Sequence, residues 1–306
     1  MITTEVIRAA AARIAPHIRR TPVLDITDGL GLAHPVTLKL ELFQHTGSFK
    51  ARGAFNSLLS MDVPAAGVVA ASGGNHGAAV AYSAKQLDIP ARIFVPEIAG
   101  PAKIALIRST GVEPDVVPGA YADAFAASQA CQAETGAMTI HAYDAPAALA
   151  GQGTVALEWA EQSPDLDILL VAVGGGGLIG GIAAFHQGRP KVIGVEPVTA
   201  QALTAALAHG PDAQVEVSGV AANSLGARQI GRICFDIATA QGIETVLVTD
   251  DAILDAQRRL WSGARIAAEP GGAAALAALT SGAYAPPPGA KVGVLVCGGN
   301  LDPSPF

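Results

Sequence analysis

The stretch Thr46-Gly47-Ser48-Phe49-Lys50-Ala51-Arg52-Gly53 separates two segments that have different hydrophobic periods. Residues 36–42 alternate apolar and polar side chains, which predicts a strand, whereas the apolar residues from Ala54 onward follow a helical spacing. Lys50 is therefore expected near the start of a helix, where the helix dipole disfavours an ammonium group. A neutral amine attacks aldehydes, so Lys50 is a candidate nucleophile, although a solvent-exposed role is commoner for lysine.

The composition limits the classes of partner and compartment. The 306 residues suggest about two domains, and half of them are hydrophobic, which is enough for a large core. A net charge of −7 and the lack of a basic block argue against a nucleic-acid partner. The three cysteines show no CxxC spacing, which predicts free thiols in a reducing cytoplasm, and the N-terminal segment shows no signal-peptide pattern.

One uncharged segment resembles a membrane helix at first sight. Residues 168–188 contain no Asp, Glu, Lys or Arg, and a membrane helix needs about 20 apolar residues. Four consecutive glycines, Gly174 to Gly177, stand in the middle of this segment and would break such a helix. We therefore expect a buried strand, a glycine turn and a helix here, and no association with a membrane.

Two runs of alternating strands and helices predict an α/β protein with parallel sheets. In the first run, strands are expected at 67–71, 91–96, 112–117 and 138–141, and helices at 75–87, 101–109 and 121–134. In the second run, strands are expected at 167–173, 191–196, 245–249 and 291–297, and helices at 146–160, 177–187, 199–208, 251–265 and 270–280. A first helix is expected over 3–18 with Thr3 or Thr4 as its N-cap, and Asp250 is the expected N-cap of the helix at 251–265.

Ligands of open α/β sheets bind beyond the carboxyl ends of the strands, and four expected strand ends carry unusual residues. Ser72-Gly73-Gly74-Asn75-His76 follows the first of them. Backbone N–H groups in such a bend can bind a carboxylate or a phenolate-like oxygen. An ordinary asparagine-capped helix with His76 on an exposed turn is an equally consistent interpretation.

The second strand end carries Gly174-Gly175-Gly176-Gly177. Four consecutive glycines allow backbone amides to approach a phosphate group closely. The segment also matches a dinucleotide motif through Gly175, Gly177 and Gly180, with Glu196 at the end of the next strand. A nicotinamide-binding oxidoreductase is therefore an alternative at this point.

The other two strand ends carry a carboxylate and a thiol. Glu196 could bind a ribose hydroxyl or a cation, or could be a charge at the rim of the sheet. Cys297 closes the strand at 291–297. A buried cysteine is most often an inert apolar residue, so Cys297 gains a role only from its context.

Six motifs in one order carry a family resemblance: SFKARGA at 48–54, SGGNHG at 72–77, GGGGLIGG at 174–181, VEPVTAQA at 195–202, EPGGAAAL at 269–276 and CGGN at 297–300. From about residue 5 to residue 301, the chain resembles the fold-type II pyridoxal-phosphate enzymes, in the branch of serine/threonine dehydratases and serine racemases. The resemblance implies an α/β fold like that of the tryptophan synthase β chain, with two domains that are each an open, mostly parallel sheet with helices on both faces. Residues 1–55 and 145–306 would form the large cofactor-binding domain, and residues 56–144 the small domain with the asparagine loop.

The resemblance implies a role for each matching residue. Lys50 is expected to form the Schiff base with pyridoxal phosphate, and Phe49 to pack against the pyridine ring. Asn75 is expected to hydrogen-bond the ring hydroxyl, Gly174, Gly175, Gly176 and Gly177 to bind the phosphate, and Cys297 to face the pyridine nitrogen. The residues expected to bind the substrate carboxylate are Ser72, Gly73, Asn75 and His76.

The resemblance also implies the reaction. The cofactor accepts electrons from the substrate Cα, and Lys50 acts as general base on the Cα proton. Loss of the β-hydroxyl then converts L-threonine or L-serine to a 2-oxo acid and ammonia. A neutral Cys297 thiol cannot keep the pyridine nitrogen protonated as a carboxylate would, which favours elimination over transamination.

Several positions depart from the pattern of the racemases. Gly73 stands where racemases carry a second serine, so we expect little racemisation. Glu196 and the carbonyl of Ala200 match a cation site, but Ala202 replaces a carboxylate, which favours a monovalent ion such as potassium over Mg²⁺. Tyr143, expected in the substrate pocket, replaces a smaller asparagine.

The sequence alone does not define the size of the substrate pocket or the preferred amino acid. Ala124 replaces a racemase arginine, which argues against 3-hydroxyaspartate as substrate. Another β-hydroxy amino acid, such as phenylserine, is possible, and residues 223–228 are a candidate pocket wall or a surface loop.

Other activities remain as alternatives. Within the family these are a serine racemase and a β-replacement enzyme of the cysteine-synthase type, against which His45-Thr46-Gly47 argues because an asparagine-proline pattern is usual there. Outside it are the nicotinamide-binding oxidoreductase and a non-catalytic cofactor-binding module. A small-molecule amino acid is the expected partner, and a cytoplasmic homodimer is the expected form.

Overall fold

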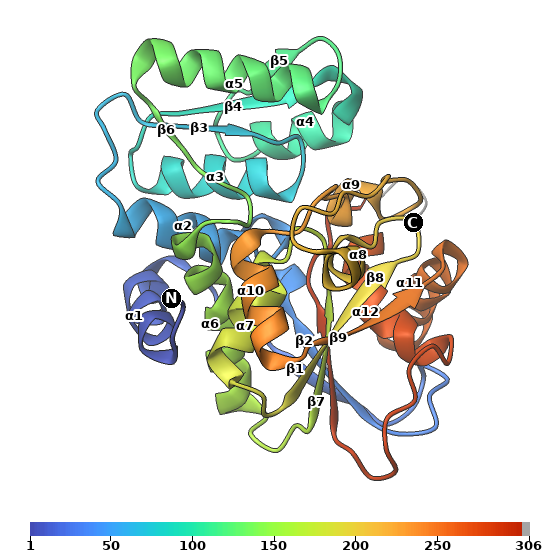
Figure 1. Ribbon diagram of the computed structural model, residues 1–306. Helices are drawn as coiled ribbons and strands as arrows, with labels where there is room; N and C mark the ends of the chain where they lie inside the picture. The colour runs from blue at the N-terminus through green and yellow to red at the C-terminus, as the bar shows by residue number, and fades with distance from the viewer. Residues whose placement is uncertain (302–306) are drawn as a thin grey trace.

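The computed structural model describes residues 1–301 and contains two sheets, one in each half of the molecule (Figure 1). The larger, six-stranded sheet has the order β1 (Val23–Ile26), β2 (Val36–Leu40), β10 (Val292–Val296), β7 (Ile168–Ala172), β8 (Lys191–Pro197) and β9 (Glu244–Val248). The smaller, four-stranded sheet has the order β5 (Asp115–Val117), β4 (Ala91–Pro96), β3 (Val68–Ala71) and β6 (Met138–Thr139). Within residues 1–301, every strand pair is parallel except β1 with β2, which confirms the expected α/β class.

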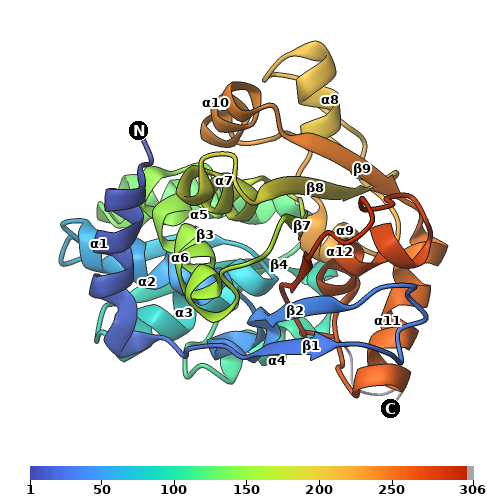
Figure 2. The same ribbon diagram turned by 90° about the horizontal axis from the view of Figure 1, so that it is seen from below.

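Helices cover both faces of each sheet. Figure 2 shows α6 (Pro146–Gln162) and α7 (Gly177–His186) on one side of the larger sheet, with α1 (Thr4–Ile14) packed against these two helices. On the other side lies α12 (Pro270–Thr280), with α11 (Asp250–Ala264) packed against it. The smaller sheet lies between α5 (Tyr121–Thr135) on one face and α3 (Asn75–Gln86) with α4 (Pro101–Arg108) on the other. The remaining helices are α2 (Lys50–Ser60), α8 (Ala202–His209), α9 (Ala222–Leu225) and α10 (Arg232–Gln241).

The helix α2 connects the two halves, because it packs against α6 of the large half and α3 of the small half. The strands of the smaller sheet lie within residues 68–139 and those of the larger sheet lie before and after them, while α2 crosses the expected boundary at residue 55. We therefore keep the division into 1–55 with 145–306 and 56–144 as a proposal.

The core is built from small and branched apolar residues. Every residue of β7 and of β10 is buried, as expected for central parallel strands that are covered on both faces. The backbones of α6 and α7 approach each other closely, because a Cβ atom on Gly153 would lie 2.8 Å from the carbonyl oxygen of Gly181. Among the described residues, no helix has the length and the hydropathy that crossing a membrane requires.

Some local expectations were wrong. The helix α11 is capped by Thr249, whose side chain accepts a hydrogen bond from the backbone N–H of Ala252, and Asp250 is already inside the first turn. The helix expected over 199–208 starts at Ala202, and the first helix ends at Ile14. The short strand β1 and the helices α9 and α10 were missed, although the apolar residues of α10 have helical spacing.

Candidate active site

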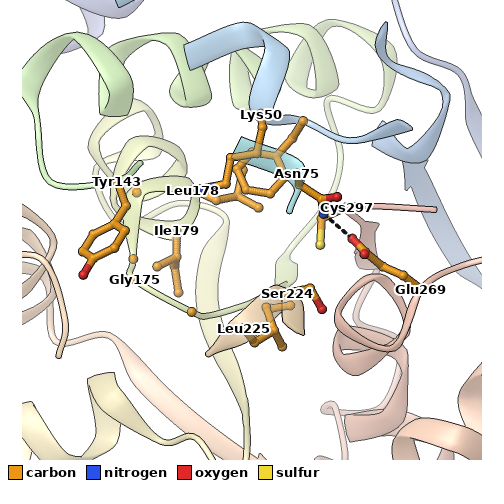
Figure 3. A pocket seen from close by; sticks show the side chains of 15 residues that line it. Lys50, Asn75, Tyr143, Gly175, Leu178, Ile179, Ser224, Leu225, Glu269 and Cys297 are labelled. Carbon is orange, nitrogen blue, oxygen red and sulfur yellow. Dashed lines mark hydrogen bonds between the residues drawn. The ribbon is translucent and has the colours of Figure 1, made fainter. Parts of the chain in front are cut away.

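A pocket at the carboxyl ends of the large sheet gathers residues from motifs that are far apart in the sequence (Figure 3). The backbone N–H of Phe49 donates to the carbonyl oxygen of Cys297 at 3.2 Å, and Ser48 forms a β-bridge with Gly298. These contacts hold the start of α2 next to the end of β10. The pocket is lined by Phe49, Lys50, Asn75, Tyr143, Ala172, Gly174, Gly175, Gly176, Gly177, Leu178, Ile179, Ser224, Leu225, Glu269 and Cys297.

Lys50 is the first residue of α2 and points into this pocket. Its Nζ donates to the carbonyl oxygen of Ala142 at 2.8 Å and lies 5.1 Å from the ring centre of Phe49. Burial lowers the pKa of Lys50 to about 8, so about a tenth of the amine is neutral at pH 7, far more than for an ordinary lysine. The direction of this shift agrees with the expectation, but its principal cause is burial rather than the helix dipole.

The glycine loop between β7 and α7 forms one wall of the pocket. A Cβ atom on Gly175 would collide with the ring of Tyr143, and Gly176 has a φ of 89°, which side chains other than glycine rarely adopt. The first N–H groups of α7 have no partner within their own helix and lie beside the loop. This combination of free N–H groups and a positive helix end is suited to a phosphate group.

The asparagine loop brings only part of its residues to the pocket. Asn75, the first residue of α3, lines the pocket and donates from Nδ2 to Oε1 of Glu269 at 2.6 Å. The Oγ of Ser72 accepts a hydrogen bond from the N–H of Gly74 at 3.2 Å and so shapes the loop.

His76 does not reach the pocket. Its ring is buried and its Nε2 lies 2.9 Å from the carbonyl oxygen of Ile140. Burial lowers the pKa of His76 to about 3, so the ring is neutral and donates to Ile140. This position disagrees with both expectations for His76. The side chain does not point to where a substrate carboxylate would bind, and it does not lie on an exposed turn.

Cys297 and Tyr143 complete the pocket. The Sγ of Cys297 donates to the carbonyl oxygen of Gly271 at 3.4 Å, and burial raises the pKa of this thiol, which keeps it neutral. The ring of Tyr143 lies on Gly175, and its hydroxyl donates to the carbonyl oxygen of Gln229 at 3.4 Å. Tyr143 therefore closes the glycine wall of the pocket.

The expected cation residues lie outside the pocket lining. The carboxylate of Glu196 is fully buried and accepts hydrogen bonds from the backbone N–H groups of Leu203 and Thr204 and from the hydroxyl of Thr204. Glu196 thus caps the start of α8. Because this carboxylate is fully buried, it is out of reach of a ribose hydroxyl, which the nicotinamide alternative required it to bind.

The Glu196 carboxylate has one acceptor position left for a cation. A carboxylate offers about four acceptor positions, and Glu196 keeps one of them, at Oε1. Within residues 1–301, no group of three or more His, Cys, Asp and Glu side chains could hold a metal ion.

Sequence reasoning missed two residues next to Asn75. Glu269 lines the pocket, and Asn300 donates from Nδ2 to Oδ1 of Asn75 at 2.8 Å. Both belong to motifs that carry the resemblance, EPGGAAAL and CGGN, so their presence at strand ends and helix starts was the available signal. Ser224 and Leu225 also line the pocket, and the segment 223–228 is therefore a pocket wall as well as a loop.

The charge of Glu269 gives a pH-dependent stability. Burial raises the pKa of Glu269 to about 7, whereas a carboxyl group in the unfolded chain titrates at 4.5. The native state therefore binds more protons between these pH values, and this contribution to stability is lost as the pH rises through 7. We expect Glu269→Gln to stabilise the cofactor-free protein by about 3 kcal/mol at pH 8 and to have little effect at pH 4.5. Thermal melts at both pH values test this, and equal effects of the substitution at both would contradict it.

The residues of this pocket fit the cofactor that the resemblance implies. The amine of Lys50 suits an aldehyde, the glycine loop suits a phosphate, and the neutral Cys297 thiol suits an uncharged ring nitrogen. The crowding around Gly175 explains why this wall carries no side chain. The structure thus places in one pocket a group for each end of pyridoxal phosphate.

Comparisons with known proteins agree with this fit. The model of the family described as "Pyridoxal-phosphate dependent enzyme" matches residues 14–298. Phenylserine dehydratase of Ralstonia pickettii is 36% identical over 96% of this chain and 92% of its own length. L-threonine ammonia-lyase of Thermotoga maritima is 35% identical over 99% of this chain and 76% of its own length.

The solved structures give the same result. The structure of maize serine racemase superimposes with a TM-score of 0.91 at 33% identity, covering 99% of this chain and 95% of that one. The family model spans most of the chain, and these relatives exceed 30% identity over nearly its whole length. The chain therefore belongs to the family of pyridoxal-phosphate dependent enzymes.

Proposed function

We propose that this enzyme is a dehydratase that converts a β-hydroxy L-amino acid, L-threonine or L-serine among them, to a 2-oxo acid and ammonia. The observation that carries the proposal is the pairing of Lys50 with a neutral, buried thiol, Cys297, in one pocket. The relatives named phenylserine dehydratase and L-threonine ammonia-lyase support it.

When bound, pyridoxal phosphate supplies an electron-accepting ring that stabilises negative charge at the substrate Cα. The residues of the chain do the rest. The amine of Lys50, with its pKa near 8, can accept the Cα proton at Nζ at neutral pH. The N–H groups at the start of α7 would hold the phosphate of the cofactor.

The neutral thiol of Cys297 would limit how strongly the ring of a bound cofactor withdraws electrons. A carboxylate at this position would keep the ring nitrogen protonated, whereas a thiol whose pKa is raised by burial does not. A thiol at this position would therefore favour elimination of the β-hydroxyl over transamination.

A cleft of about 960 Å³ beside the pocket offers room for the substrate. It lies between α4 and α11 and shares Asn75, Ser224 and Glu269 with the cofactor pocket. Its apolar lining includes Leu106 and Leu254, and Lys103 adds a positive charge that suits a substrate carboxylate. This volume exceeds what L-serine requires and leaves space for a phenyl group at Cβ.

The experiment that tests the proposal is a substrate panel of L-serine, L-threonine and 3-phenylserine, with 2-oxo acid and ammonia measured separately. We expect both products in equal amounts from at least one hydroxy amino acid. Cofactor binding without product from any of them would support the non-catalytic module instead. Conversion of L-serine mainly to D-serine would support the racemase alternative.

The surroundings of Gly73 leave no room for the serine that racemases carry at this position. A Cβ atom at residue 73 would lie 2.6 Å from the Cβ of Ala99 and 3.1 Å from Cγ1 of Val95, so it would point into the small domain. We therefore expect Gly73→Ser to lower activity without creating D-serine. Gly73→Ser combined with Ala99→Gly is the matched control that relieves the collision. Chiral chromatography of the products measures the outcome, and abundant D-serine from the single variant would show that residue 73 faces the substrate.

We propose that any bound cation is monovalent and uses the free acceptor position of Glu196 with the carbonyl of Ala200. The loss of a carboxylate at Ala202 and the hydrogen bonds that Glu196 already accepts support this. We expect turnover to be faster in potassium than in tetramethylammonium buffer and to be unaffected by a chelator of divalent ions. Equal rates in the two buffers would argue that Glu196 serves only as the cap of α8.

We also propose that the enzyme is a cytoplasmic homodimer. Its three cysteines, Cys131, Cys234 and Cys297, are all free and buried, which suits a reducing compartment. Light scattering after size-exclusion chromatography would measure the oligomeric state directly.

A further inference from the structure

The amide of Asn75 is held between two side chains that come from distant parts of the sequence. Its Nδ2 donates to Oε1 of Glu269 at 2.6 Å, and its Oδ1 accepts from Nδ2 of Asn300 at 2.8 Å. Glu269 directly precedes α12, and Asn300 follows β10. Figure 3 shows Asn75, Glu269 and Cys297 together on one side of the pocket and Tyr143 with Gly175 on the other.

The orientation of both amides follows from one backbone group. The Nδ2 of Asn300 lies 2.7 Å from the carbonyl oxygen of Thr46, and a carbonyl only accepts hydrogen bonds, so the NH₂ end of Asn300 must face it. The second N–H of Asn300 then points at Asn75, which must present its oxygen. The NH₂ end of Asn75 is consequently turned to Glu269 and to the pocket.

Two glycines make these approaches possible. Gly47 has a φ of 74°, and a Cβ atom there would collide with the amide of Asn300. A Cβ atom on Gly298 would collide with the carboxylate of Glu269. One set of hydrogen bonds therefore joins the segment before Lys50 to Asn75, Glu269 and Asn300. Glycine at residues 47 and 298 leaves the space that these bonds need.

The geometry points to Asn300 and Glu269 as positioning residues, which fix the Asn75 amide so that its remaining N–H donates to the ring hydroxyl oxygen of pyridoxal phosphate. The side-chain amide of Asn75 has two N–H groups, and one of them donates to the carboxylate of Glu269. In pyridoxal phosphate the hydroxyl and the phosphate arm flank the aldehyde on opposite sides. With the aldehyde at Lys50 and the phosphate at the glycine loop, the hydroxyl faces the Asn75 side of the pocket.

Variants of matched size separate positioning from packing. Asn300→Asp keeps the volume but replaces the NH₂ group that faces Thr46 and Asn75 by an oxygen. Glu269→Ala removes the acceptor for Asn75, whereas Glu269→Gln can still accept through its amide oxygen. Asn56→Asp is the control, since the Nδ2 of Asn56, like that of Asn300, donates to a backbone carbonyl, here that of Ala147. Its Oδ1 accepts from Arg13, and both contacts lie away from the pocket.

The measurement is a titration of the cofactor-free full-length protein with pyridoxal phosphate, read from the visible absorption band of the bound cofactor. We expect the dissociation constant to rise roughly tenfold to a hundredfold in Asn300→Asp and Glu269→Ala, as the loss of a charge-assisted or buried hydrogen bond would produce. We expect a rise below about threefold in Glu269→Gln and in Asn56→Asp. The absorption maximum should also move in the first two variants, because the hydroxyl oxygen loses its donor.

Unchanged binding and an unchanged spectrum in Asn300→Asp would overturn the inference. Equal losses in Asn300→Asp and Asn56→Asp would also overturn it, since they would indicate general destabilisation. The titration needs no substrate, so its result does not depend on whether the enzyme is a dehydratase. Failure of the substrate panel with a normal titration would refute only the proposed reaction.

Discussion

Replacing Lys50 by alanine is expected to reduce the release of 2-oxo acid by about 10⁴-fold or more, because one amine serves as attachment point and as general base. Lys50 is the lysine that lines the cofactor pocket in the described part of the chain. Burial lowers the pKa of Lys50 to about 8, which shows that the charged amine is not favoured in this pocket. We therefore expect Lys50→Ala to leave the free energy of unfolding nearly unchanged. Steady-state rates with the best substrate of the panel measure the loss.

Two controls make this result specific to the site. Lys85→Ala removes an exposed amine from α3 and should leave the rate unchanged. Borohydride reduction of the wild-type holoenzyme, followed by peptide mass spectrometry, should place the cofactor on the peptide that contains Lys50. An adduct on another lysine, or full activity in Lys50→Ala, would falsify the assignment of this pocket.

Replacing Arg52 by methionine is expected to lower the free energy of unfolding by about 3–5 kcal/mol, since it leaves buried carboxylates without their partner. The guanidinium of Arg52 donates to both oxygens of Glu41, at 2.8 and 2.7 Å, and to Glu158 at 2.9 Å. Lys39 pairs with the same Glu158, and all four side chains are almost fully buried. The cluster has two positive and two negative charges, so losing one cation leaves a net buried charge.

The melting temperature should fall by roughly 10 °C in Arg52→Met. The matched control is Arg108→Met, which breaks an exposed pair with Glu113 and should change stability by less than about 0.5 kcal/mol. Because Arg52 is two residues after Lys50, the cofactor content of the variant should be measured as well. A melting temperature like that of wild type would mean that water or rearrangement compensates the two carboxylates.

Much of the fold could be read from the sequence because its determinants are local. The alternation of apolar strands with helices, and the glycine-rich turns after them, predicts parallel sheets whose ligand lies at the strand ends. Lys50, Asn75, Gly175 and Cys297 all follow this rule, and the structure gathers them in one pocket. The family match then agrees with the order of the motifs.

Tertiary structure alone decided which partner each polar side chain found. Glu196 had the position of a ligand residue, but the start of α8 folds back on it, and His76 turns to the carbonyl of Ile140. The sequence determined where functional groups stand along strands and helices, because those periods depend on neighbouring residues. The bonds from Asn75 to Glu269 and Asn300 join residues about 200 positions apart, and only the packing of the two halves brings such residues within hydrogen-bond distance.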